Sequence, residues 1–89
     1  MITQNINRIN GKDTEIDFDN VNIKDRDNLS FIIMDKITKR KIKLNELVYY
    51  YKNTLTLFIP NQIKIPPSTY TYTIAENGKV IANGEIKVK

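Results

Sequence analysis

Apolar and polar residues alternate along most of this chain with a period of two residues. The alternation is clearest in residues 54–59 and 69–74, and Ile16 and Phe18 alternate in the same way with acidic residues. A period of two is typical of strands with one buried face, because successive side chains of a strand point to opposite faces of the sheet. The pattern predicts six or seven short strands, arranged as an antiparallel sandwich or a small barrel.

Two segments depart from this alternation. Residues 29–34 are apolar on both faces, which is typical of a central strand. Residues 60–67, PNQIKIPP, carry prolines at both ends, and each proline removes a donor from a sheet ladder. We therefore expect residues 60–67 to be a crossing connection, in which Ile63 and Ile65 close one end of the core.

Residues 69–84, TYTYTIAENGKVIANG, predict a β-hairpin. Asn77 and Gly78 are the two residues that a type I′ turn prefers, because both central positions of that turn require a positive φ. The turn would place Glu76 opposite Lys79, which is a favourable pair of charges. The hairpin is therefore the best-defined local structure in the sequence.

A second Asn-Gly pair, at 83–84, follows within seven residues. With the turn alone, Ile74 faces Ile81, and the later apolar residues of the returning strand fall on the threonine face. One extra residue on that strand corrects the phase, and a glycine in the left-handed region is a common means of making such a bulge. We therefore predict a bulge at 83–84, after which Tyr70 faces Ile86.

The first ten residues are ambiguous. Ile2, Ile6 and Ile9 have helical spacing, but the asparagines among them disfavour a helix. We expect residues 1–10 to form an N-terminal arm or edge strand that contacts a neighbouring protein through these three isoleucines. Residues 11–89 would then form a single domain.

The composition argues against catalysis. The chain has no cysteine and no histidine, so it lacks disulfides, thiolate ligands and the usual general base. Its three glycines are isolated, so no phosphate-binding loop is present. Four alternating acids at 13–19 could suggest calcium, but their strand rhythm favours a solvated strand face. We expect a protein that is not an enzyme and that binds no metal and no cofactor.

The apolar runs are short. None approaches the ~18 residues that cross a bilayer, and the first ten residues lack the basic-then-apolar order of a signal peptide. We therefore expect a chain that is made in the cytoplasm and that has no membrane partner.

Positive charge is concentrated in the later part of the chain. Residues 1–28 carry 4 basic and 6 acidic side chains, a balance of −2, and residues 29–89 carry the other 10 basic and 4 acidic ones, a balance of +6. Lys39, Arg40 and Lys41 lie in the densest basic stretch, between two predicted strands. This turn could dock on an acidic protein surface, bind phosphate, or remain a solvated loop. Residues 49–51 are consecutive tyrosines, whose rings alternate between faces and make a poor platform for stacking bases.

The order of elements from residue 29 onward resembles the small immunoglobulin-like modules of tailed-bacteriophage virion proteins, such as baseplate, head-fibre and capsid-decorating proteins. The shared signature is Pro-x-x-Tyr-x-Tyr at 67–72, followed by NGKVIANG at 77–84. In that group a glycine commonly precedes the Tyr-x-Tyr strand, whereas this chain has Ser68-Thr69. Residues 1–28 have no counterpart.

The resemblance implies a small all-β, immunoglobulin-like antiparallel β-sandwich of about seven strands with a short N-terminal arm. It also implies a structural or auxiliary role in a bacteriophage virion. The partners would be other virion proteins such as a major capsid protein, bound in many copies, with Lys39, Arg40 and Lys41 as docking residues. The alternatives are a small basic β-barrel that binds nucleic acid, and a host-interaction protein that adds its edge strand to a partner.

Overall fold

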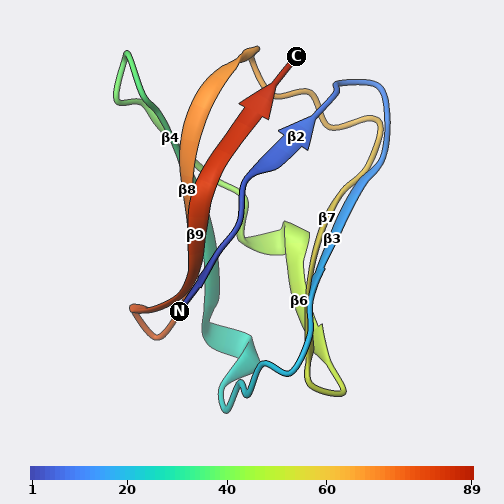
Figure 1. Cartoon of the computed structure of the whole chain (residues 1–89), viewed down its shortest axis with the longest axis vertical. Coiled ribbons are helices and arrows are strands. Elements are labelled where there is room, and N and C mark those ends of the chain that lie inside the picture. The colour runs from blue at the N-terminus through green and yellow to red at the C-terminus, as the bar shows by residue number, and fades with distance from the viewer.

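The chain folds into two β-sheets that pack face to face (Figure 1). The computed structural model describes all residues from 1 to 89, and its only helices are two single 3-10 turns, η1 (Arg26–Asn28) and η2 (Asn45–Leu47). The strands are β1 (Ile2–Thr3), β2 (Ile6–Arg8), β3 (Thr14–Phe18), β4 (Leu29–Asp35), β5 (Lys41–Lys43), β6 (Val48–Tyr51), β7 (Thr54–Ile59), β8 (Ser68–Glu76) and β9 (Lys79–Val88).

The strand order defines a sandwich. One sheet has the order β1-β9-β8-β4-β5, with β2 also paired to β9, and the other has the order β3-β7-β6. The prediction of an all-β sandwich is therefore confirmed. The predicted total of about seven strands is not confirmed, because the structure has nine: seven in residues 11–89 and two in the first ten residues.

The expectation of a fully antiparallel arrangement is also wrong. Both β1 and β2 run parallel to β9, with Ile2 opposite Ala82 and Ile6 opposite Ile86. Because both pairs differ by 80 residues, β1 and β2 share one register and form two parts of the same edge. Alternation of apolar residues predicts a strand but not its direction relative to a partner, which explains the error.

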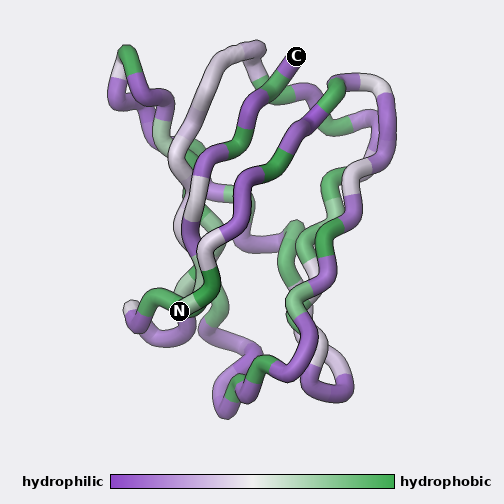
Figure 2. The backbone as a smooth tube through the Cα atoms, in the orientation of Figure 1, coloured by the Kyte–Doolittle hydropathy of each residue, from purple (hydrophilic) through white to green (hydrophobic).

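The core lies between the two sheets and contains 19 buried apolar residues. Figure 2 shows hydrophobic and hydrophilic positions alternating along the strands, as the period of two predicts. Residues 29–34 lie in β4, which has partners on both sides, so the central strand is confirmed. The crossing connection at 60–67 contains no strand, and it contributes the buried Ile65 and the partly buried Ile63, as predicted.

The β8–β9 hairpin has the predicted turn. Asn77 and Gly78 have φ values of 49° and 81°, and Glu76 pairs with Lys79. The register shifts between Ile74 and Ala75, whose partners are Ala82 and Val80, so Ile81 is the extra residue. The predicted bulge exists, but its predicted position at 83–84 and the predicted pair of Ile74 with Ile81 are wrong. The predicted pair of Tyr70 with Ile86 is confirmed.

Gly84 is required by a close approach of two backbones rather than by a bulge. A Cβ at this position would overlap the carbonyl oxygen of Gln4 and would lie 3.0 Å from Cε2 of Tyr72. The φ of Gly84 is 155°, a backbone angle that residues with a side chain rarely adopt. The missing side chain allows the Tyr72 hydroxyl to reach across β9 and donate to the Gln4 carbonyl at 2.7 Å.

Candidate protein-docking site

The turn between β4 and β5 is organised by Asp35. The backbone N–H groups of Ile37 and Thr38 donate to its carboxylate at 2.8 and 2.9 Å, and the N–H of Lys39 donates to its carbonyl oxygen at 2.9 Å. Hydrogen bonding, first of all from Thr38, lowers the pKa of Asp35. Lys39 completes the turn with a φ of 63°. The turn is therefore a defined structure.

The hairpin presents three basic side chains to solvent, which we call the basic tip: Lys39, Arg40 and Lys41. All three are exposed, and none lies within 4.0 Å of a carboxylate, because the only ion pair in the structure is elsewhere. Ile37 is 86% exposed beside them. The hairpin projects from the sandwich in Figure 1, and Figure 2 shows a hydrophobic position at its end between hydrophilic ones. The structure thus brings the three predicted docking residues together on one projecting turn.

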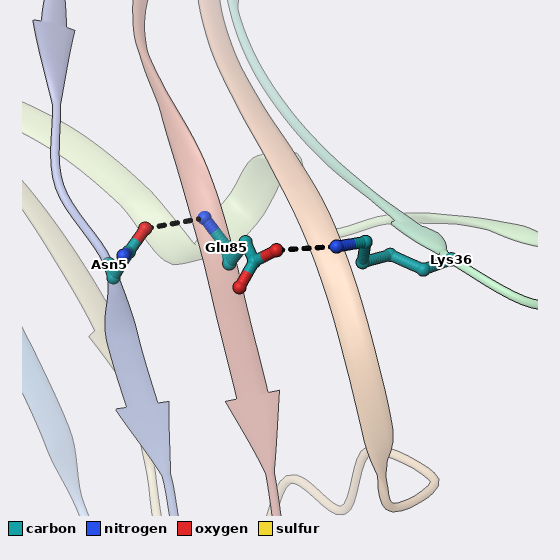
Figure 3. A network of polar contacts seen from close by, with 3 residues as sticks. All are labelled: Asn5, Lys36 and Glu85. Carbon is teal, nitrogen blue, oxygen red and sulfur yellow. Dashed lines mark hydrogen bonds and ion pairs between the residues drawn. The ribbon is translucent and has the colours of Figure 1, made fainter.

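Lys36, at the base of the same hairpin, does not belong to the basic tip. Its Nζ lies 2.5 Å from Oε2 of Glu85 on β9, and the backbone N–H of Glu85 donates to Oδ1 of Asn5 at 3.1 Å (Figure 3). The hydrogen bond and charge of Lys36 lower the pKa of Glu85. The network fixes the hairpin base to β9 and to the segment that joins β1 and β2.

A groove of about 470 Å³ lies beside the basic tip. The buried Tyr70 and the partly buried Ile42 form its apolar base, and exposed Arg40 and Pro66 lie at its margin. The Tyr70 hydroxyl donates to the Pro66 carbonyl at 2.5 Å, which holds this side of the groove in place. Sequence reasoning did not identify the groove, because Pro66 and the hairpin are far apart in the chain.

The three predicted arm residues occupy different environments. Ile6 is 2% exposed and belongs to the core, so in this fold it cannot contact a partner as predicted. Ile2 packs partly against the core, and Ile9 is 49% exposed. The arm is used inside this chain because its strands pair with β9 and cover the edge of the larger sheet.

Arg8 is the polar residue that sequence reasoning missed. Its side chain is fully buried, with 0% exposure, and it has no carboxylate within ion-pair distance. The guanidinium donates instead to five oxygens, which belong to Lys12, Thr14, Ile59, Pro60 and Ile63. Desolvation lowers the pKa of Arg8, and the nearby charge of Asp13 opposes that shift. Arg8 thereby connects β2 to the start of β3, to the end of β7 and to the segment that follows β7.

Two other sequence features lie away from the hairpin. The acids at 13–19 are exposed, as a solvated strand face predicts, and no group of three or more acids is placed to hold a metal ion. Tyr49 and Tyr51 are 52% and 63% exposed on β6, which belongs to the other sheet, whereas the Tyr50 hydroxyl donates to the Val21 carbonyl at 2.6 Å. The exposed tyrosines and the basic tip therefore do not form one surface (Figure 1).

Comparison with known proteins adds no family to this description. No protein-family model matches the chain, and no curated protein matches it in sequence. The structure contains no helix with the length and apolar character to cross a membrane.

Proposed function

We propose that this chain is a non-enzymatic structural or auxiliary protein of a bacteriophage virion. It docks through the basic tip on a capsid or another virion protein lattice, and it is made in the host cytoplasm. The observation that carries the proposal is the hairpin, which combines three unpaired cations, an exposed Ile37 and a turn held by Asp35. A fixed, projecting turn of this kind loses little conformational freedom when it binds.

The strand arrangement supports an immunoglobulin-like domain. If β3 to β9 are read in chain order as strands B, C, C′, D, E, F and G, the sheets become B-E-D and C′-C-F-G. Tyr70, near the start of strand F, donates to the carbonyl of Pro66 four residues earlier, as in the tyrosine corner of that fold. One departure is that β1 and β2 pair with the last strand, G, instead of joining the B-E-D sheet.

The sequence resemblance to virion modules covers residues 29–89, and these residues include the hairpin and the Tyr70 corner. On a symmetric lattice each copy meets an equivalent surface, so many weak contacts hold a layer of copies in place. The expected partner surface is acidic, because the basic tip has no carboxylate partner within this chain.

Copy number on purified particles tests this function. Quantitative mass spectrometry of particles from the natural source should find the chain in a fixed ratio, with many copies for each particle. A cytoplasmic protein of similar abundance serves as the control for material carried over during purification. If the chain were no more enriched on particles than this control, the proposal would be wrong.

Nucleic-acid binding is the alternative that the basic tip raises. The exposed tyrosines lie on the other sheet, and Tyr70, the aromatic residue beside the tip, is buried. The tip therefore offers no exposed ring on which bases could stack. A binding titration with single-stranded DNA between about 50 and 200 mM salt separates the two functions, because phosphate contacts give a steep decline in affinity. Tight binding with a steep salt dependence would favour the alternative over lattice docking.

A further inference from the structure

The groove beside the basic tip lies on the inward face of the larger sheet. Ile42 is directly opposite Ile33, which is fully buried, and Tyr70 is opposite the buried Ile86. Residues that lie directly opposite in an antiparallel pair share a face. None of the residues that line the groove belongs to β3, β6 or β7. The inward face of this hairpin therefore extends past the sheet that covers the rest of the core. The partly buried Ile42 and the exposed Pro66 supply the accessible apolar surface of the groove, above the buried Tyr70.

The charges at the margin of the groove are unequal. Asp35 supplies one carboxylate, and this carboxylate already accepts two backbone hydrogen bonds from the turn. Arg40 and Lys41 supply two cations, and neither has an ion-pair partner. An arginine side chain can donate two parallel hydrogen bonds to a carboxylate, which gives it a preference for acidic groups in a defined orientation. The margin thus favours an anionic ligand, whereas the base favours an apolar one.

We propose that this groove receives one apolar side chain from an acidic segment of the partner protein. The apolar side chain packs on Ile42 and Pro66, and a neighbouring carboxylate pairs with Arg40. Charge complementarity and the accessible apolar surface of Ile42 and Pro66 argue for this occupant over a purely charged one. The proposal rests on the docking function proposed above and adds the chemistry of the segment that is bound.

Two synthetic peptides test the groove directly: acetyl-Asp-Asp-Leu-Asp-Asp-amide and the same peptide with serine in place of leucine. Each is titrated into the ¹⁵N-labelled chain and followed by NMR. The leucine peptide should bind about tenfold more tightly, since burying part of a leucine side chain contributes roughly 1.4 kcal/mol. The amide signals that shift most should be those of Thr38, Arg40 and Ile42.

Two variants test whether the peptide binds in the groove or is attracted only by the net charge of the chain. Arg40→Gln should weaken binding of the leucine peptide several-fold, whereas Lys87→Gln, which removes an exposed cation from β9, should change it less than twofold. Equal affinities for the two peptides, equal effects of the two variants, or signal shifts confined to other surfaces would each overturn the groove proposal. Those outcomes leave docking by charge intact, whereas absence of the chain from particles overturns the proposed function whatever the peptides do.

Discussion

Arg8 and the basic tip are both basic and both lie next to isoleucines, but the fold uses them in opposite ways. Arg8 is fully buried, and five oxygens of the same chain accept its hydrogen bonds. The basic tip is exposed and has no carboxylate partner in the chain. The role of a basic residue therefore depends on its partners within the fold, and its neighbours in the sequence do not specify those partners.

Substitutions in the two regions should also affect different properties of the protein. A buried cation that donates to several oxygens of its own chain stabilises the fold, because its removal leaves those buried and partly buried oxygens without their donor. An exposed cation without a partner contributes little to the folded state. Substitutions at Arg8 should therefore affect folding, and substitutions at the tip should affect binding.

The largest expected effect is that of Arg8→Met. This variant should lower the free energy of unfolding by about 3–5 kcal/mol, because it leaves five oxygens, one buried and four partly buried, without the donor that Arg8 supplies. Urea denaturation followed by circular dichroism measures the loss. Arg8→Lys keeps the charge but has fewer donors. Its stability should therefore lie between that of the natural chain and that of Arg8→Met. A loss below about 1 kcal/mol for Arg8→Met would contradict the structural role of Arg8.

Gly84→Ala should have the next largest effect, because the new Cβ overlaps the Gln4 carbonyl and separates the N-terminal strands from β9. We expect a loss of about 2–3 kcal/mol together with faster hydrogen exchange at the amides of β2. Gly11→Ala is the matched control, because Gly11 has a φ of 89° but nothing within 4 Å of its Cβ position. Gly11→Ala should cost about 1 kcal/mol. Equal losses of stability for the two variants would show that the φ value alone, and not the close approach, explains why position 84 requires glycine.

The burial of the Tyr72 hydroxyl predicts that stability depends on pH in the alkaline range. Burial raises the pKa of Tyr72 to about 12, above the value of about 10 that applies in the unfolded chain. The folded state therefore retains its full stability below about pH 10 and loses stability as the pH rises toward 12. Tyr72→Phe should be less stable by about 1 kcal/mol at pH 7 and should show a smaller decline above pH 10. The exposed Tyr49→Phe is the control, and an identical alkaline decline in all three proteins would contradict the assignment.

The smallest expected effect on stability is that of replacing Lys39, Arg40 and Lys41 together by serine. The free energy of unfolding should change by no more than about 0.5 kcal/mol, because these side chains make no ion pair in the chain. Urea denaturation of this variant and of Arg8→Met compares their free energies of unfolding directly. A loss comparable to that of Arg8→Met would remove the distinction between the two regions.

Local features of the fold could be predicted from the sequence. The Asn77-Gly78 turn depends on two adjacent residues, and the pair of Tyr70 with Ile86 follows from keeping apolar residues on one face. The position of the bulge could not be predicted in the same way. A glycine in a strand indicates either a bulge or a close backbone approach, and only the path of the N-terminal strand distinguishes the two for Gly84.

The candidate site was only partly predictable for the same reason. The basic turn is a local feature, so its three residues were named correctly as neighbours on one hairpin. The groove depends on Pro66 and Tyr70 lying beside that hairpin, and three of the five acceptors of Arg8 lie more than fifty residues from it in the chain. One signal for Arg8 was present, because alternation places it on the same strand face as the buried Ile6.

Competition between two forms of the chain on particles tests the central claim most directly. Equal amounts of the isotope-labelled natural chain and the triple serine variant of the basic tip are mixed with particles that lack the chain. Mass spectrometry then measures the ratio of the two forms bound at about 150 mM salt. The account predicts that the bound variant is depleted several-fold while its stability in solution is unchanged. Equal binding of the two forms would contradict it.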